Sequence, residues 1–300
     1  MILVAAALLL GISQQRDSTL ATIEARIHQE PDAQVGLAYM DLASADTLFL
    51  NADTSFHAAS TMKVPVMIEL FRRANSGSFT MAQPLMVVNQ FASIVDGSPY
   101  ALDLGSDSDS TLYRRVGGRV PVDTLLRLMI TRSSNFATNI LISLVGADQV
   151  TRTMRALGAE RIQVLRGVED GKAFDKGLNN TTTARDLAII LRAIEEGRAA
   201  GPEATRQMRE ILLAQEFNEK IPAGLPAGVR VAHKTGEITA HSHDAAIVYP
   251  PGRRPYVLVV LTRGIQDGAK SSKLIADISS IIYGRNSAHS SAIRARASQE

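Results

Sequence analysis

A serine and a lysine stand three residues apart where an apolar helical stretch begins, in the segment STMKVPV at residues 60–66. Side chains three positions apart lie on one face of a helix, so the hydroxyl of Ser60 and the amine of Lys63 could share a pocket. Such a pair can make a nucleophile if burial or nearby cations depress the pKa of the amine. Serine is also a common helix N-cap and lysine a common surface residue, so the rest of the chain must decide.

Two further short motifs carry side chains of a related kind. Ser133 and Asn135 frame the segment SSN between two helical stretches, and Lys234 begins the segment KTG on a predicted strand. Each motif alone is weak evidence, because a solvated lysine on a strand and an asparagine at a helix cap are both common. The ordered set S-x-x-K, S-x-N and K-T-G is typical of class A β-lactamases and penicillin-binding proteins.

On these motifs the chain resembles the class A β-lactamase family, in the same order and over about residues 18–285. The segments RGVED, which contains Glu169, NNTTTARDLA and HDAAIVYPPGRRPYVLVVLTRG are similar to their family counterparts as well. The resemblance implies an acyl-enzyme mechanism that opens the amide of a small-molecule β-lactam. It implies no cofactor and no metal.

The resemblance also assigns catalytic roles. Ser60 would be the nucleophile, and Lys63 a base or proton relay. The acylation base is disputed in the family between this lysine and a glutamate acting through water, and both stay open here. Ser133 would pass a proton to the departing β-lactam nitrogen, with Lys234 nearby to attract a substrate carboxylate. Glu169, on an irregular Ω-type loop, would activate the water that releases the acyl group.

Substrate-binding roles are implied for the strand that contains KTG and for the SSN turn. Asn135 would hold the side-chain amide of the substrate. Gly236, next to Thr235, would let an acyl group approach the strand closely. The backbone N–H groups of Ser60 and Glu237 would form the oxyanion hole.

Several positions depart from the usual family pattern. Ser134 stands where the family commonly has an aspartate that braces the loop. Glu169 follows Arg166 by three positions instead of two, and Ala173 replaces an asparagine that helps to hold the water. Glu237 adds a carboxylate beside the expected site of the substrate carboxylate, where like charges repel unless the side chain turns away. Deacylation is therefore the step that these departures affect most.

Apolar periodicity predicts the elements that must position these side chains. Strand-like segments with hairpin turns flank a mostly helical block, and amphipathic helices precede the first hairpin and follow the last. This pattern predicts an α+β fold: an antiparallel sheet flanked by terminal helices, with an inserted all-helical subdomain beside the active-site cleft. The expected divisions are a leader at 1–17, a catalytic domain at 18–285 and a flexible tail at 286–300. Within the catalytic domain, we expect an α/β part at about 18–59 and 216–285 and a helical part at about 60–215.

Local signals refine this arrangement. Thr182 or Thr183 is expected to cap one helix, and Pro202 to begin the next. Pro65 lies five residues after the presumed cap at Ser60, where a proline should remove a helical hydrogen bond and distort the start of the helix.

Composition limits the classes of function. The net charge of +2 argues against a nucleic-acid partner, and the absence of cysteine excludes disulfides and a cysteine nucleophile. The apolar run at residues 2–12 is too short for a stable membrane span and is typical of a secretory signal, although a buried helix gives the same pattern. Together with the family resemblance, the apolar run leads us to expect a bacterial protein that is periplasmic or secreted, and we expect it to be a monomer.

Other functions are compatible with parts of the sequence. The same fold and nucleophile could cleave cell-wall D-alanyl peptides or small esters, or could acylate and stall as a penicillin-binding sensor. A histidine-rich grouping has zinc-like spacing, but no third set of ligands is evident. Its members are His233, His241, His243 and Asp244. The acidic loop at 103–109 lacks the glycine and terminal glutamate of a calcium-binding EF-hand.

Overall fold

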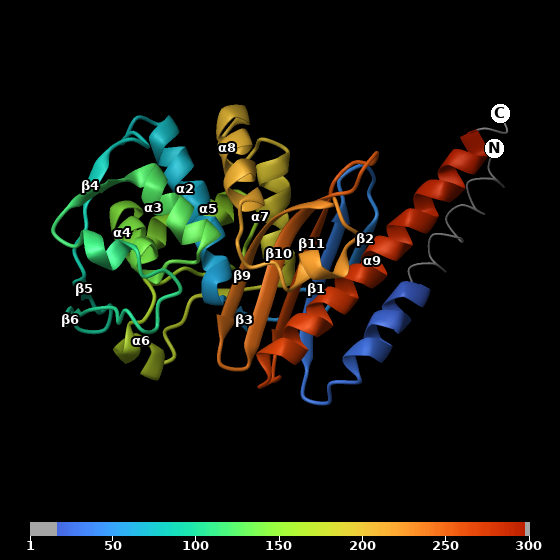
Figure 1. The fold of residues 1–300 in the computed structure, drawn as a ribbon, viewed down its shortest axis with the longest axis horizontal. Coiled ribbons are helices and arrows are strands. Elements are labelled where there is room, and N and C mark those ends of the chain that lie inside the picture. Colours follow the sequence, from blue (N-terminus) through green and yellow to red (C-terminus); the bar gives the residue numbers. More distant parts are fainter. Residues whose placement is uncertain (1–16, 298–300) are drawn as a thin grey trace.

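Five antiparallel strands form the central sheet of the computed structural model, which describes residues 17–297. The strand order is β2-β1-β11-β10-β9 (Figure 1). The strands are β1 (Gln34–Asp41), β2 (Thr47–Leu50), β9 (Arg230–Ile238), β10 (His241–Tyr249) and β11 (Tyr256–Arg263). The sheet and both of its predicted hairpins, β1–β2 and β10–β11, are confirmed.

Both faces of the sheet are covered, because successive strand residues enter different cores. In β11, Val257 and Val259 pack toward the helical block, whereas Leu258 and Val260 pack toward the terminal helices. Those terminal helices are residues 17–27 and α9 (Gly268–Ala297), which lie together on one side of the sheet (Figure 1). A strand buried on both faces loses the usual alternation of polar and apolar residues, which accounts for the continuous apolar runs in β10 and β11.

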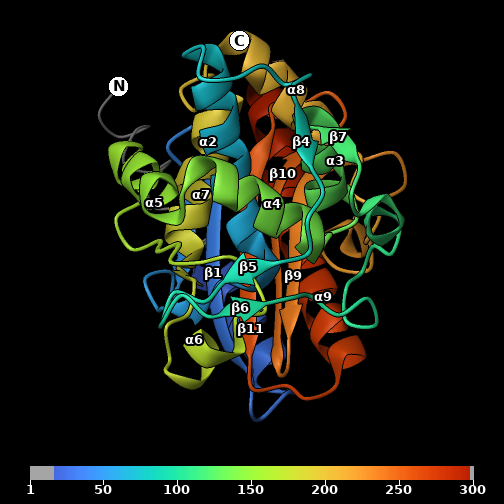
Figure 2. The same cartoon turned by 90° about the vertical axis from the view of Figure 1, so that its left-hand side faces the viewer.

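The helical block lies on the opposite face, where α2, α4, α5 and α7 stand in front of the strands in Figure 2. Its helices are α2 (Lys63–Asn75), α3 (Val122–Thr131), α4 (Asn135–Val145), α5 (Ala147–Ala156), α6 (Gly171–Asp175), α7 (Ala184–Glu195) and α8 (Pro202–Leu213). Short strands join the block: β3 (Phe56–His57), β4 (Pro84–Met86), β5 (Phe91–Ala92), β6 (Pro99–Tyr100), β7 (Arg119–Pro121) and β8 (Thr181–Thr182). The 3-10 turns are η1 (Ala59–Met62), η2 (Leu112–Arg115) and η3 (Ile221–Gly224).

Helix boundaries follow the expected chemistry. Thr183 caps α7, since its hydroxyl accepts a hydrogen bond from the backbone N–H of Asp186 at 3.1 Å, and Pro202 is the first residue of α8. The distortion expected at Pro65 is present, because the chain makes the 3-10 turn η1 before α2 begins at Lys63. Pro65 thus lies in the first turn of α2, where a backbone N–H would have no partner within the helix.

The carboxyl-terminal end differs from the expected tail. Helix α9 continues to Ala297, through residues for which the sequence predicted no regular structure. Alanine and arginine are strong helix formers, and no proline interrupts this stretch, so local propensity allows the helix to continue. The apolar run at residues 2–12 lies outside the described residues. Among the residues that are described, no helix is long and apolar enough to cross a membrane.

The contact between α9 and η3 can be tested at a glycine. A Cβ atom at Gly224 would overlap the carbonyl oxygen of Ala276 in α9. Gly224→Ala is expected to lower the free energy of unfolding by about 1–3 kcal/mol, as overpacking does. Gly268→Ala is the matched control, because a Cβ there meets no atom within 4 Å. Urea unfolding of both variants checks this; equal stability of the two would contradict it.

Candidate active site

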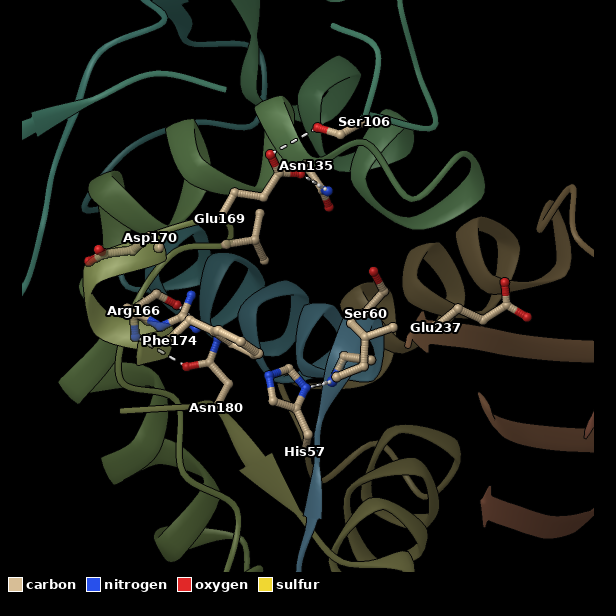
Figure 3. A pocket seen from close by; sticks show the side chains of 14 residues that line it. His57, Ser60, Ser106, Asn135, Arg166, Glu169, Asp170, Phe174, Asn180 and Glu237 are labelled. Atoms are coloured by element: carbon tan, nitrogen blue, oxygen red, sulfur yellow. Dashed lines mark hydrogen bonds between the residues drawn. The ribbon is translucent and has the colours of Figure 1, made fainter. Parts of the chain in front are cut away.

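Ser60 lies in η1, at the start of α2, and its hydroxyl points into the opening drawn in Figure 3. It lines two adjoining cavities of about 390 Å³ and about 300 Å³. The preceding residue, Ala59, has a φ of 44° and donates its backbone N–H to Nδ1 of His57 at 3.0 Å. Burial lowers the pKa of His57 to about 4, so this nitrogen is an unprotonated acceptor at neutral pH. The histidine thus holds the Ala58–Ala59 peptide, one residue before Ser60.

Lys63 is fully buried, and its ammonium group points at the turn before α4. It donates to the carbonyl oxygen of Ser133 at 2.6 Å, to Oδ1 of Asn135 at 2.8 Å and to Oγ of Ser133 at 3.2 Å. Burial lowers the pKa of Lys63 to about 7, although the charges of Asp107 and Glu169 oppose this shift. Lys63 is therefore bonded to the SSN turn, and the direct Ser60 contact that the spacing suggested is not among its hydrogen bonds within the described chain.

Ser133 lies between two lysines. Its Oγ accepts hydrogen bonds from Lys63 at 3.2 Å and from Lys234 at 3.0 Å. Lys234 is fully buried as well and also donates to the carbonyl oxygen of Thr235 at 2.9 Å. Burial, followed by repulsion from Lys63, lowers the pKa of Lys234 well below its usual value. The structure thus joins the three motifs at one hydroxyl.

Strand β9 runs close against η1. A Cβ atom at Gly236 would stand 3.0 Å from the backbone nitrogen of Ser60 and 3.1 Å from that of Thr61. The glycine is therefore required first by the approach of one backbone to another, and not only by a bound acyl group. Thr235, Gly236 and Glu237 line the smaller cavity together with Ser60.

The side chain of Glu237 turns away from Ser60 (Figure 3). Its Oε1 accepts a hydrogen bond from the ammonium group of Lys220 at 2.7 Å. Lys220 is almost fully buried, with 1% of its surface exposed, and lines the same cavity. The expected repulsion of a substrate carboxylate is thus reduced, because a cation sits beside the added carboxylate.

Glu169 comes to the site from the opposite side. Its Oε1 accepts a hydrogen bond from Nδ2 of Asn135 at 2.6 Å, and its Oε2 accepts one from Ser106 at 3.1 Å. Asn135 therefore bridges Glu169 and Lys63. Glu169 has a φ of 60°, in the left-handed region that side chains other than glycine adopt rarely, so the loop holds it in a specific orientation.

The loop around Glu169 is attached to α4 and closed on itself. Asn139 of α4 accepts a hydrogen bond from the backbone N–H of Val168 at 2.7 Å and donates one to the carbonyl oxygen of Val168 at 3.0 Å. Arg166 closes the loop by donating to the carbonyl oxygen of Leu178 at 2.8 Å. Ala173 is fully buried, so the loop has no polar side chain at the position where the family has asparagine.

The histidine-rich grouping does not form a metal centre. His233 is buried and bonds through Nδ1 to Oδ1 of Asp244 at 2.9 Å, while His243 bonds through Nε2 to the carbonyl oxygen of His57 at 2.9 Å. These side chains satisfy separate backbone and carboxylate partners. Within residues 17–297, no cluster of three or more side chains is arranged to hold a metal ion.

Several residues of the site carried no recognisable signal in the sequence. Lys220 and Asn139 lie outside the three motifs, in segments without unusual composition. Phe174 is 56% exposed and lines the larger cavity. The sequence motifs in its segment pointed only to the carboxylate of Glu169. Asp107 lies in the acidic loop at 103–109, whose sequence pattern bears only on calcium binding; it accepts a hydrogen bond from the backbone N–H of Asn135.

Comparison with known proteins finds relatives that cover most of the chain. The chain is 30% identical to β-lactamase AST-1 of Nocardia asteroides over 265 residues, which is 86% of this chain and 81% of the relative. The solved structure of PBP-A has a TM-score of 0.77 and 27% identity, covering 89% of this chain and 95% of PBP-A. An acyl-enzyme complex of a PBP-A mutant with penicillin G has the same TM-score and identity, covering 89% of this chain and 96% of that one.

A β-lactamase structure from Sphaerobacter thermophilus has a TM-score of 0.75 and 26% identity, with 90% of this chain and 95% of that one covered. The profile described as the β-lactamase enzyme family matches residues 18–285, which hold all the side chains described above. The protein therefore belongs to the β-lactamase enzyme family.

Proposed function

We propose that this protein is a serine hydrolase that opens the amide of a β-lactam through an acyl-enzyme on Ser60, with Glu169 assisting deacylation. The observation that carries the proposal is the convergence of Lys63 and Lys234 on Oγ of Ser133, beside the cavity that Ser60 lines. The names of the relatives support it, as does the acyl-enzyme that a PBP-A mutant forms with penicillin G. We also propose that the protein is exported as a monomer, with the apolar run at residues 2–12 as its leader.

Acylation needs an acceptor for the proton of Ser60. Because the pKa of Lys63 is about 7, a substantial fraction of its amine is neutral near pH 7 and able to accept a proton. Glu169, acting through water, is the other candidate, and it faces the same opening (Figure 3). Ser133 would relay a proton to the departing nitrogen, since its hydroxyl already contacts both lysines.

The developing negative charge on the substrate oxygen would be bound by backbone N–H groups of Ser60 and Glu237. The packing of β9 against η1 brings these two segments together, with Gly236 at the contact. One such donor contributes roughly 3 kcal/mol in known acyl-transfer sites. The substrate carboxylate would lie near Lys234 and Lys220, and its negative charge would favour the protonated form of the Lys234 amine, whose pKa burial lowers.

One observation favours a second candidate, a penicillin-binding sensor that acylates without turnover. Both carboxylate oxygens of Glu169 already accept hydrogen bonds, from Asn135 and Ser106, so only part of the acceptor capacity of the carboxylate is left for a catalytic water. A D,D-peptidase or esterase on the same fold is the remaining alternative. Turnover, a persistent adduct and peptide cleavage distinguish the three activities.

Two substitutions test the proposed roles. Ser60→Ala is expected to abolish adduct formation, because it removes the nucleophilic hydroxyl. Glu169→Gln is expected to leave acylation measurable but to slow deacylation about 10²–10⁴-fold, the range of general-base effects. The assays are hydrolysis of a chromogenic cephalosporin and mass spectrometry of the intact protein.

Asp175→Asn is the matched control for Glu169→Gln, since Asp175 is an exposed carboxylate at the end of α6, six residues after Glu169. Normal turnover by the Glu169→Gln variant would contradict the deacylation role. A burst followed by a stable adduct in the unsubstituted protein would identify a sensor, and cleavage of a D-Ala-D-Ala peptide without lactam opening would identify a peptidase.

The pH dependence of acylation tests Lys63 as the base. The lysine must be neutral to accept a proton, and its pKa is lowered to about 7, so the acylation rate should rise through a limb near pH 7. Below that pH the amine is protonated and the rate should fall about tenfold per unit. Stopped-flow measurement of the burst phase between pH 5 and 9 checks this. A rate that is flat from pH 5 to 8 would assign the proton to another acceptor.

A further inference from the structure

The first turn of α4 begins directly after the turn that holds Ser133, and its backbone N–H groups need acceptors. Two of them are bound by one carboxylate: Asp107 accepts from the N–H of Asn135 at 2.9 Å and from that of Phe136 at 2.8 Å. Ser134 accepts from the N–H of Ala137 at 3.2 Å. A carboxylate from a loop 28 residues away in sequence thus completes the N-terminus of this helix.

Asp107 is itself held in place. Its Oδ2 also accepts from the hydroxyl of Tyr113 at 3.1 Å, and its Oδ1 from the backbone N–H of Asp109 at 3.2 Å. Four donors therefore fix both oxygens of a half-buried side chain. Charge-assisted bonds of this kind are about twice as strong as neutral ones, and the positive end of the α4 dipole adds to them.

The turn at residues 133–135, which Asp107 holds in place, positions the reactive groups. Ser133 has a φ of 57°, a conformation that persists only where neighbouring contacts enforce it. Its hydroxyl oxygen accepts hydrogen bonds from Lys63 and Lys234. The side chain of Asn135 forms hydrogen bonds with both Lys63 and Glu169. A rotation of this turn would move all these contacts at once.

We propose that Asp107 is the positioning residue that sets the geometry of the turn at 133–135, taking the place of an aspartate at position 134. This inference rests on the proposed function for its effect on catalysis, but its structural part does not. Ser134 reaches one N–H of the first turn, whereas the carboxylate of Asp107 reaches two. The negative charge that would have come from the turn itself comes from the neighbouring loop.

The charge of Asp107 also acts on Lys63. The charged groups that act on this amine are Asp107 and Glu169, which favour its protonated form, and Lys234, which opposes it. Removing the charge of Asp107 should therefore lower the pKa of Lys63 further. In kinetics, the acid limb of acylation should move to lower pH.

Asp107→Asn tests the proposal, because it keeps the shape of the side chain and removes its charge. We expect kcat/KM for a cephalosporin to fall about 10- to 100-fold, the range for losing hydrogen bonds to a charged group. We also expect the acid limb to shift to lower pH. Asp103→Asn, an exposed carboxylate in the same loop, is the matched control and should change neither property.

A measurement without substrate separates this proposal from the proposed function. Hydrogen–deuterium exchange of the peptide that spans residues 133–137 should be faster in Asp107→Asn than in Asp103→Asn or the unsubstituted protein. If the unsubstituted protein opens no β-lactam, the proposed function fails, and this exchange result still decides whether Asp107 holds the turn.

The double variant Asp107→Asn with Ser134→Asp supplies a carboxylate from the turn itself. It should recover most of the lost activity and the slow exchange, since an aspartate at the N-cap can accept from the first turn of α4. Two results would overturn the proposal: unchanged exchange and activity in Asp107→Asn, or a folded double variant that keeps the full defect.

Discussion

Two buried ammonium groups meet at one hydroxyl, and the rest of the site depends on this arrangement. Lys63 and Lys234 are fully buried, and both donate to Oγ of Ser133. Moving an ammonium ion out of water costs several kcal/mol unless hydrogen bonds and opposite charges compensate for it. At Lys63 the charges of Asp107 and Glu169 do not outweigh burial, so its pKa stays near 7. The fold thus holds an amine that loses its proton near neutral pH.

This arrangement forms where the helical block meets the sheet. The turn η1 carries Ser60 and leads into α2, which begins at Lys63. The turn before α4 carries Ser133, and β9 carries Lys234. The three segments share one apolar core, which extends from the sheet face into the helices. Close packing leaves each segment little freedom, and at Gly236 the backbones of β9 and η1 approach so closely that a side chain would not fit without movement. The packing of these three segments therefore also sets the positions of the reactive side chains.

The sequence predicted what local patterns encode. Strand runs and the cap at Thr183 gave the sheet and helix boundaries, and the short motifs identified residues that the structure brings together. The sequence did not predict the roles of Asp107 and Lys220, because these roles depend on partners 28 and 17 residues away. No local pattern distinguishes the two residues from other charged residues. Residues 286–297 were expected as a tail because they lack an apolar face, yet α9 includes them through helix propensity. The sequence therefore did not predict contacts between distant segments, nor a helix that continues past its apolar face.

The protonation of Lys63 can be measured directly. Lysine labelled with ¹³C at Cε reports the titration of each amine by NMR, and the signal of Lys63 is assigned by its loss in a Lys63→Arg variant. Burial at the Ser133 turn predicts a midpoint of about 7 in the full chain. A midpoint near the ordinary lysine value of about 10.4 would contradict the account, because the amine would then be charged throughout the physiological range.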